Sequence, residues 1–193
     1  MTENTLYNAQ GKRLYLTAEE RHAFYEAAKN HKREIRTFCH TLYVTGCRIS
    51  EALELTIDKI DLSEQAVIFR TLKKRGKVIY RGVPVPSDYI DSIDMVHCAK
   101  EAQKQKKNRK LWGWSRATAW RKVKAVMLEA GIDTALPHAT AKGLRHAYGI
   151  HAIASGVPLT ELQKLLGHAD LKTTSIYLNA QGAEKRALVS RMW

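Results

Sequence analysis

The spacing of apolar residues along the chain predicts a mostly helical protein. Thr17 and Glu20 have the spacing of a capping box, and a helix to about Asn30 is expected to follow, with Phe24 facing inward. Gly46 suits the C-terminal end of the next helix because glycine tolerates the left-handed backbone found there. Apolar residues at helical intervals predict further helices over 34–45, 49–55, 87–104, 115–130, 140–155, 159–166, 171–178 and 183–191.

One stretch changes to a composition typical of strands. Residues 66–72 and 77–85 are rich in β-branched and aromatic side chains, and they flank the tight basic turn Lys73-Lys74-Arg75-Gly76. Two prolines end the second strand, and Ser87 is expected to cap the helix that follows. The pattern therefore predicts a mainly α-helical fold that carries a small β-hairpin or three-stranded antiparallel sheet.

Length, composition and charge indicate one folded domain that binds a polyanion. The chain has 193 residues, of which 45% are hydrophobic, so it can bury a globular core. It carries 32 Lys and Arg against 19 Asp and Glu, a net charge of +13, which favours nucleic acid as its partner. A solvated basic surface would carry the same charge. Residues 1–16 are expected to form a loosely held N-terminal arm, and residues 17–193 a single domain.

Basic side chains are concentrated between residues 104 and 124, a stretch without acids. The candidates for contacts with DNA phosphates are its lysines and arginines: Lys104, Lys106, Lys107, Arg109, Lys110, Arg116, Arg121, Lys122 and Lys124. A solvated basic face is the competing interpretation. Trp112 and Trp114 lie among these charges and suit either core or surface, whereas Trp120 is expected in the core.

Several classes of protein are disfavoured. Cys39, Cys47 and Cys98 are odd in number and lack C-x-x-C spacing, which argues against a disulfide framework or a zinc site. Cys39 and Cys47 are expected in helical core. No apolar run is long enough for a membrane span, and the N-terminus has no apolar signal core, so we expect a cytoplasmic protein without a membrane partner. Neither an acidic cluster suited to Mg²⁺ nor a Walker string is present, so no metal and no cofactor are expected.

Four local signals carry candidate chemistry. Arg48 opens a helix within TGCRISE, and Arg145 precedes His146 within KGLRHAYG. Lysines lie at the hairpin turn, and Tyr177 follows His168 by nine residues within LLGHADLKTTSIY. Each signal alone has a common structural explanation, such as a surface ion pair, a solvated turn or a core aromatic. We therefore interpret them together.

Together these residues supply what the cleavage of a DNA phosphodiester requires. The Tyr177 hydroxyl can attack phosphorus once it loses its proton. The guanidinium groups of Arg48 and Arg145 match the geometry of the non-bridging oxygens and stay charged. A lysine on the hairpin can protonate the departing 5′-oxygen, and His168 can donate a hydrogen bond to a phosphate oxygen in the transition state.

This constellation resembles the tyrosine recombinases, also called lambda-type integrases, over roughly residues 17–193. In the family, an arginine follows a Thr-Gly pair and precedes a string such as Ile-Ser-Glu, so Arg48 matches the first catalytic arginine. The second motif usually reads H-x-L-R-H. Here it reads KGLRH, so Arg145 matches the second arginine, and Lys142 stands where histidine is commoner. The family's LLGH, then TT, then Tyr is matched by His168 and Tyr177 at the expected spacing.

The resemblance also implies roles for neighbouring residues. The family places a catalytic lysine at the hairpin turn, where Lys73 aligns best, Lys74 competes and Lys77 is third. Glu51 matches an acid that orients an active-site neighbour. Glu51 and His146 are expected to contact the catalytic side chains and hold them in position. Lys142 remains in the catalytic set.

The resemblance implies a domain organisation and partners. Most members carry an N-terminal helical domain that clamps the opposite face of the DNA, and this chain is expected to lack it. The implied partners are duplex DNA with a specific recombination site, further copies of the chain in a tetramer on DNA, and an accessory DNA-bending protein, with a monomer when free. A C-terminal apolar stripe is expected to pack onto a neighbouring subunit or in cis: Ala187, Leu188, Met192 and Trp193.

Three other functions remain open from the sequence. Residues 159–178 can be interpreted as a helix-turn-helix of a DNA-binding protein without catalysis, which leaves Arg48 and the tyrosine unexplained. A type IB topoisomerase would use similar chemistry, but the chain is short for that class. A decayed integrase would bind DNA without cutting it.

Overall fold

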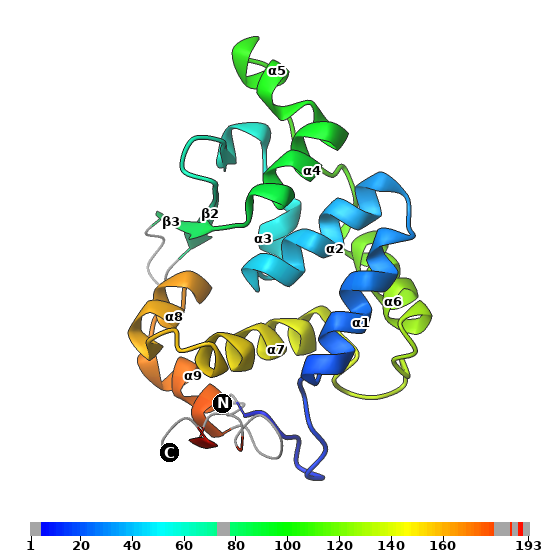
Figure 1. The fold of residues 1–193 in the computed structure, drawn as a ribbon, viewed down its shortest axis with the longest axis vertical. Coiled ribbons are helices and arrows are strands. Elements are labelled where there is room, and N and C mark those ends of the chain that lie inside the picture. The colour runs from blue at the N-terminus through cyan, green and yellow to red at the C-terminus, as the bar shows by residue number, and fades with distance from the viewer. Residues whose placement is uncertain (1–4, 73–77, 180–185, 187–188, 191–193) are drawn as a thin grey trace.

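Helices dominate the structure, a computed structural model that describes residues 5–179 except 73–77, and residues 186, 189 and 190. The elements follow in this order: α1 (Ala18–Lys29), α2 (Arg33–Thr45), α3 (Ile49–Leu53), η1 (Ile57–Lys59), β1 (Ile60–Asp61), β2 (Ala66–Leu72), β3 (Val78–Pro84), α4 (Ser87–His97), α5 (Ala99–Lys104), α6 (Arg116–Glu129), α7 (Ala141–Ala154), α8 (Leu159–Leu166), α9 (Leu171–Ser175) and η2 (Ile176–Asn179). Figure 1 shows α5 at the upper end of the long axis and α7, α8 and α9 towards the lower end. Most of the helix expected over 183–191, and the apolar stripe of the C-terminal segment, lie outside the described residues.

Local sequence signals start and end two helices as expected. The Thr17 hydroxyl accepts a hydrogen bond from the Glu20 backbone N–H, and the Glu20 carboxylate accepts one from the Thr17 N–H. The capping box at the start of α1 is therefore confirmed. α2 ends at Gly46, whose φ of 58° lies in the left-handed region that glycine adopts without strain.

The single helix expected over 87–104 is wrong, because the structure has two helices there. α4 begins at Ser87 itself, and Pro86 occupies the capping position. Cys98 adopts a left-handed backbone with φ of 50° and separates α4 from α5. A left-handed residue other than glycine is uncommon, so a cysteine at this position does not indicate a helix end. The apolar spacing continues across it.

The hairpin belongs to a three-stranded antiparallel sheet in the order β1-β2-β3. β1 is a short edge strand that the composition pattern does not single out. In the register of β2 and β3, Val67 lies opposite Val83, and Phe69 lies opposite Arg81. The three apolar members of these pairs are buried. The expected fold, mainly helical with a small antiparallel sheet, is confirmed, while the turn over 73–77 lies outside the described residues.

The main core surrounds α2, which packs against α1, α3, α4, α6 and α7. Phe38 and Leu42 of α2 are buried there together with Val123 and Met127 of α6. Cys39 and Cys47 are also buried in the core. The expectation of helical core is confirmed for Cys39, whereas Cys47 lies between α2 and α3.

The tryptophans divide between core and surface. Trp112 is buried, and its indole N–H donates to the Glu34 carbonyl at 3.0 Å. Trp114 is half-buried. The expectation of a buried Trp120 is wrong, because this side chain is 49% exposed. It lies at the edge of the inward face of α6, which Ala119 and Val123 occupy.

A second, smaller core lies beneath α8 and η2. Ile150 of α7, Leu162 of α8 and Tyr177 of η2 are buried in it together with Leu6 and Tyr15 of the N-terminal segment. The expectation of a loosely held arm is therefore wrong for the described part of this segment. Its apolar side chains cover the elements that carry the candidate nucleophile.

Candidate active site

Five of the six predicted catalytic residues lie in described parts of the chain, and all five line one pocket. Arg48 occupies the position before α3, Arg145 lies in the first half of α7, His168 follows α8, and Tyr177 lies in η2. The pocket has a volume of about 530 Å³. Its lining includes these predicted residues: Arg48, Lys142, Arg145, His146, His168 and Tyr177. Segments more than a hundred residues apart in the sequence thus meet at one site.

Arg145 is fixed by three acceptors. Its Nη1 donates to the Gly46 carbonyl at 2.8 Å, and its Nη2 donates to the Leu166 carbonyl at 2.8 Å and to His168 Nε2 at 2.9 Å. Burial is the main cause that lowers the pKa of Arg145, to about 10, with the charge of Arg48 adding to the effect. Arg145 therefore stays charged at neutral pH, and its guanidinium plane cannot rotate without losing these bonds.

Glu51 holds the other arginine. Its carboxylate accepts from the Arg48 backbone N–H at 2.8 Å and from Arg48 Nη1 at 3.1 Å. Arg81 donates to both of its oxygens, at 3.0 and 2.9 Å. Burial would raise the pKa of Glu51, but the hydrogen bonds and charge of Arg81, followed by those of Arg48, outweigh burial and lower it. Glu51 is therefore an ionised buried acceptor behind the exposed Arg48.

The sequence did not single out Arg81, which binds Glu51 behind the pocket. It lies on β3, and its Nε donates to the Leu165 carbonyl at the end of α8 at 2.9 Å. It also donates to the Thr71 hydroxyl and lies 4.8 Å from the centre of the Phe69 ring. The sequence signal for Arg81 is a charged residue on a strand face that otherwise carries apolar side chains. In the structure, Arg81 lies opposite Phe69 of β2.

His168 is held between two neighbours. Arginine can only donate, so His168 Nε2 accepts from Arg145, and its Nδ1 must carry the proton and donate to the Thr174 hydroxyl at 2.9 Å. Burial, followed by the charges of Arg145 and Arg48, lowers the pKa of His168 to about 3. The imidazole is therefore neutral at pH 7 in the free site.

Tyr177 is 2% exposed, and its hydroxyl lies 3.4 Å from His146 Nδ1. Burial raises the pKa of this hydroxyl, while the charges of Arg145 and Arg48 oppose the rise. His146 is also buried, and its Nε2 has no hydrogen-bond partner among the described residues. Burial, with the charges of Lys142 and Arg145, lowers the pKa of His146 to about 4. His146 is therefore neutral at pH 7, and its Nδ1 lies within hydrogen-bond distance of the phenol.

The Tyr177 ring packs directly against α7. A Cβ added to Gly149 would lie 2.6 Å from Tyr177 Cζ, too close for the ring to keep its place. We expect Gly149→Ala to lower the free energy of unfolding by about 1–3 kcal/mol, the usual result of overpacking a core. Alanine alone favours a helix by about 1 kcal/mol over glycine, so a net loss would identify the steric conflict.

Urea unfolding measures this effect. In the matched control Gly113→Ala, the new Cβ meets nothing within 4 Å. Its stability should therefore stay within about 1 kcal/mol of the unchanged protein. An equal or higher stability of Gly149→Ala would contradict the packing described for Tyr177.

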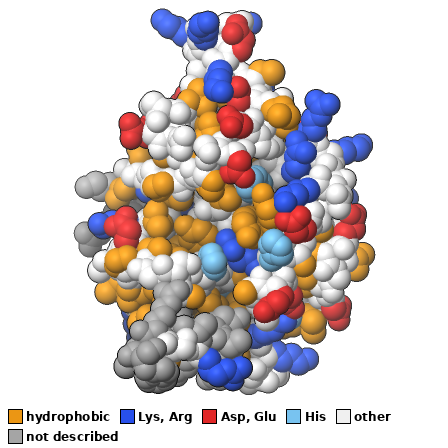
Figure 2. Space-filling model, in the orientation of Figure 1, with side chains coloured by type: hydrophobic (Ala, Val, Ile, Leu, Met, Phe, Trp, Pro, Cys, Tyr) orange, Lys and Arg blue, Asp and Glu red, His pale blue; other side chains and the backbone are white. Residues whose placement is uncertain are grey.

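The remaining predicted residues are spread more widely. Lys142 is exposed at the pocket, while Lys73, Lys74 and Lys77 lie outside the described residues. Arg116 lines the pocket beside Trp120. The basic stretch begins at the end of α5, at the upper end of the molecule in Figure 1, and then leads to Arg116. Figure 2 shows Lys and Arg side chains gathered at that upper end. Of the candidate DNA contacts, Arg116 lines the pocket, Lys104, Lys106 and Lys107 lie at or just after the end of α5, and Arg121, Lys122 and Lys124 lie on α6.

Some of these basic residues are engaged within the chain. Arg109 donates to the His97 carbonyl at 2.7 Å, and Lys110 pairs with Glu54 at 2.9 Å. Lys124 donates to the Thr134 carbonyl at 2.7 Å, and the Lys122 ammonium lies 4.8 Å from the centre of the Trp114 ring. Seven members of the set are exposed, including the engaged Arg109 and Lys110: Lys104, Lys106, Lys107, Arg109, Lys110, Arg116 and Arg121.

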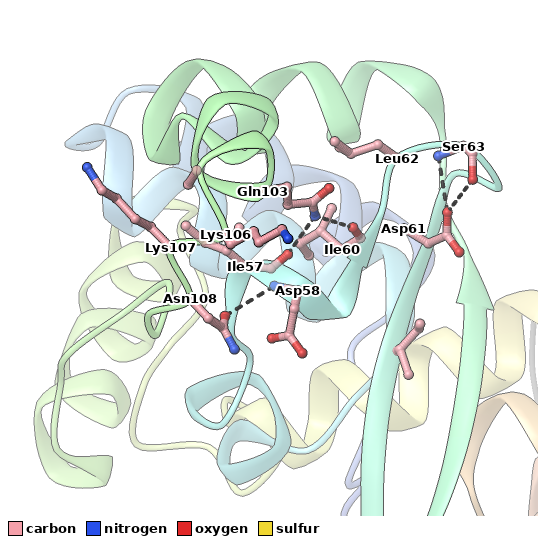
Figure 3. Close-up of a pocket in the computed structure, with 12 residues that line it drawn as sticks. Ile57, Asp58, Ile60, Asp61, Leu62, Ser63, Gln103, Lys106, Lys107 and Asn108 are labelled. Carbon is pink, nitrogen blue, oxygen red and sulfur yellow. Dashed lines mark hydrogen bonds between the residues drawn. The ribbon is translucent and has the colours of Figure 1, made fainter.

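A second pocket, of about 540 Å³, lies between η1, β1 and the end of α5 (Figure 3). The Gln103 amide donates to the carbonyls of Ile57 and Ile60, and Asp61 accepts from Ser63. These polar groups are bound to their neighbours, and no candidate nucleophile from the sequence lies among them. Among the described residues, no group of His, Cys, Asp or Glu side chains could hold a metal ion, and no helix is long and apolar enough to cross a bilayer.

Comparison with known proteins covers most of the chain. Residues 14–184 match the phage integrase family. The tyrosine recombinase XerD of Vibrio vulnificus (strain YJ016) is 35% identical over 153 residues, which cover 70% of this chain and 45% of that protein. The chain therefore spans about half the length of this relative.

Solved structures share the fold. The crystal structure of XerA recombinase matches with a TM-score of 0.76 at 22% identity, covering 96% of this chain and 65% of that chain. The XerH site-specific recombinase bound to its difH substrate matches with a TM-score of 0.70 at 20% identity, covering 96% and 59%. At these identities the likeness shows the fold alone, whereas the family match extends from the N-terminal segment past Tyr177. The chain therefore belongs to the phage integrase family, and its resemblance to the tyrosine recombinases is confirmed.

Proposed function

We propose that this chain cuts and rejoins duplex DNA at a specific recombination site through a covalent bond to Tyr177. The observation that carries the proposal is the convergence of Arg48, Arg145, His168 and Tyr177 around one pocket. A nucleophile, two cations and a hydrogen-bond donor are the groups that the transfer of a phosphodiester requires.

The proposed step exchanges one ester bond for another. The Tyr177 oxygen forms a bond to phosphorus, and the bond from phosphorus to the 5′-oxygen breaks. The phenol proton passes to an acceptor, for which His146 Nδ1 at 3.4 Å is within reach. A hairpin lysine, Lys73 first and Lys74 as the competitor, gives a proton to the departing 5′-oxygen. The 3′-phosphotyrosyl ester keeps the bond energy, so a 5′-hydroxyl can reverse the attack without ATP or a metal ion.

The arginines and His168 would stabilise the charge that develops on the phosphate. Arg48 is half-exposed, so its guanidinium can turn from Glu51 towards a phosphate. Arg145 Nη2 now donates to His168 Nε2, and a phosphate oxygen between them would accept from Arg145. The negative charge of the phosphate would also favour a proton on His168 Nε2, which makes it a donor. Lys142 would add a cation at the mouth of the pocket.

The proposed partners follow from charge and from the relatives. A net charge of +13 favours duplex DNA, and phosphate contacts from the exposed basic residues should weaken with salt. The related XerH structure contains a DNA substrate. We also propose that strand exchange uses a tetramer on two DNA sites, with a monomer off DNA, and that an accessory DNA-bending protein assists it.

The test is covalent capture of DNA. The chain is incubated with a pool of duplexes that carry randomised sequences and a nick, so that a short 5′-ended strand diffuses away after cleavage. Adducts that survive denaturation are isolated, their DNA is sequenced, and the modified peptide is identified by mass spectrometry. We expect a peptide that contains Tyr177 and a preferred DNA sequence. DNA binding without any adduct would instead favour the non-catalytic DNA-binding protein or the decayed integrase.

A further inference from the structure

Arg81 is not among the pocket-lining residues, yet it contacts the segments that hold several of them. We infer that Arg81 is a positioning residue for strand cleavage, which fixes Arg48, Arg145 and His168 through Glu51 and the end of α8. This inference rests on the proposed function of the pocket.

The contacts of Arg81 join three parts of the fold. From β3 its guanidinium donates two hydrogen bonds to Glu51 of α3, at 3.0 and 2.9 Å, and its Nε donates to the Leu165 carbonyl of α8 at 2.9 Å. A further bond to the Thr71 hydroxyl ties it to β2. One planar side chain with several donors in a fixed fork therefore sets the distance between the sheet, α3 and α8.

The end of α8 leads directly to two catalytic groups. The carbonyl of Leu166, next to the Leu165 carbonyl that Arg81 binds, accepts from Arg145. Gly167 then turns the chain with φ of 65°, and a Cβ added to it would lie 3.0 Å from Arg81 Nη1. His168 follows this turn. Arg81 thus supports the backbone that holds Arg145 on one side and places His168 on the other.

Arg81 also limits how strongly Glu51 pairs with the two other arginines. The carboxylate lies among three arginines, since Arg145 Nη1 is 3.9 Å from Glu51 Oε2 and Arg48 Nη1 is 3.1 Å from Oε1. The side chains of Arg81 and Glu51 are only 8% and 9% exposed, so water cannot replace Arg81 as the hydrogen-bond donor to the carboxylate. Without Arg81, Glu51 would pair more strongly with Arg48 and Arg145 and compete with the phosphate for them.

The test compares Arg81→Lys and Arg81→Met with the control Arg33→Met, which removes one charge from an exposed arginine at the start of α2. Thermal unfolding, DNA affinity and the single-turnover rate of adduct formation are measured on a nicked duplex captured by the unchanged chain. We expect Arg81→Lys to fold and to bind DNA within about twofold of the unchanged chain, because it keeps the charge. Its cleavage rate should fall about 100-fold, since a shift of about 1 Å in the reacting groups has this effect.

A second substrate separates positioning from general support of the fold. In a methylphosphonate linkage, a methyl group replaces one non-bridging oxygen, so the phosphorus centre is neutral and depends less on arginine. If Arg81 acts through Arg48 and Arg145, the loss in Arg81→Lys should shrink to less than about tenfold on this substrate.

Three results would overturn the inference: equal losses on both substrates, a rate for Arg81→Lys equal to that of the control, or failure of Arg81→Lys to fold. Failure of Arg81→Lys to fold would mean that Arg81 is required for folding and not specifically for positioning the catalytic groups. If Arg81→Met does not fold, Arg81→Lys alone decides the matter. Absence of an adduct with the unchanged chain would refute the proposed function instead, so the two failures are distinguishable.

Discussion

Replacing Tyr177 with phenylalanine is expected to abolish the covalent DNA adduct, with a loss of at least about 10⁴-fold in cleavage rate, because the nucleophile itself is removed. The ring would remain packed against Gly149, so the fold should be retained. The lost hydrogen bond to His146 is long, at 3.4 Å, and the stability should change by no more than about 1 kcal/mol. DNA affinity should stay the same, because no charge is removed.

The adduct is measured on denaturing gels with the captured duplex, and Tyr25→Phe is the matched control. Tyr25 is half-buried and stacks on Tyr43, with ring centres 4.7 Å apart. This variant should form the adduct at the normal rate. Other hydroxyls also line the pocket, among them Ser50 and Thr173. An adduct that persists in Tyr177→Phe would mean that one of these hydroxyls is the nucleophile, and it would refute the proposed mechanism.

Replacing Arg145 with alanine is expected to slow cleavage by about 10³-fold, the usual loss when a donor to the transition state is removed. The same change leaves the carbonyls of Gly46 and Leu166 without their guanidinium donor inside the core. The free energy of unfolding should therefore fall by about 2–4 kcal/mol. Cleavage has to be measured at a temperature where the variant is folded, which circular dichroism establishes.

A second buried arginine separates these two effects. Arg21 is buried in α1, donates to the Tyr43 carbonyl at 3.2 Å and stacks over the Tyr43 ring. It does not belong to the pocket lining, so Arg21→Ala should lose stability but keep the cleavage rate within about threefold under folding conditions. Equal losses of rate in Arg21→Ala and Arg145→Ala would mean that the rate reports unfolding, and the catalytic role of Arg145 would be abandoned.

The sequence predicted much of the site because its signals are short and local. A capping box, a glycine at a helix end and the strings around Arg48 and Arg145 each lie within a few residues. The structure places both arginines with His168 and Tyr177 at one pocket, as this interpretation requires. Whether each residue acts as the resemblance implies stays a prediction, as do the roles of Lys73 and Lys74.

The features that were missed depend on contacts between distant residues. The strand pattern places Arg81 on the apolar face but does not name its partner, because Glu51 lies thirty residues earlier in the chain. Trp120 lies about 100° around the helix from Ala119, at the edge of the inward face, where periodicity alone cannot decide exposure. Leu6 is buried in the same cluster as Tyr177 of η2, which lies about 170 residues later in the chain.

The exposure of Trp120 supplies an intrinsic optical signal for the pocket. Trp112 is shielded in the core, whereas the indole of Trp120 faces solvent beside Arg116. A duplex that occupies the pocket would displace water from this indole, and indole emission depends on such surroundings. The fluorescence of the unlabelled chain should therefore change when DNA binds, and Trp120→Phe should remove most of that change.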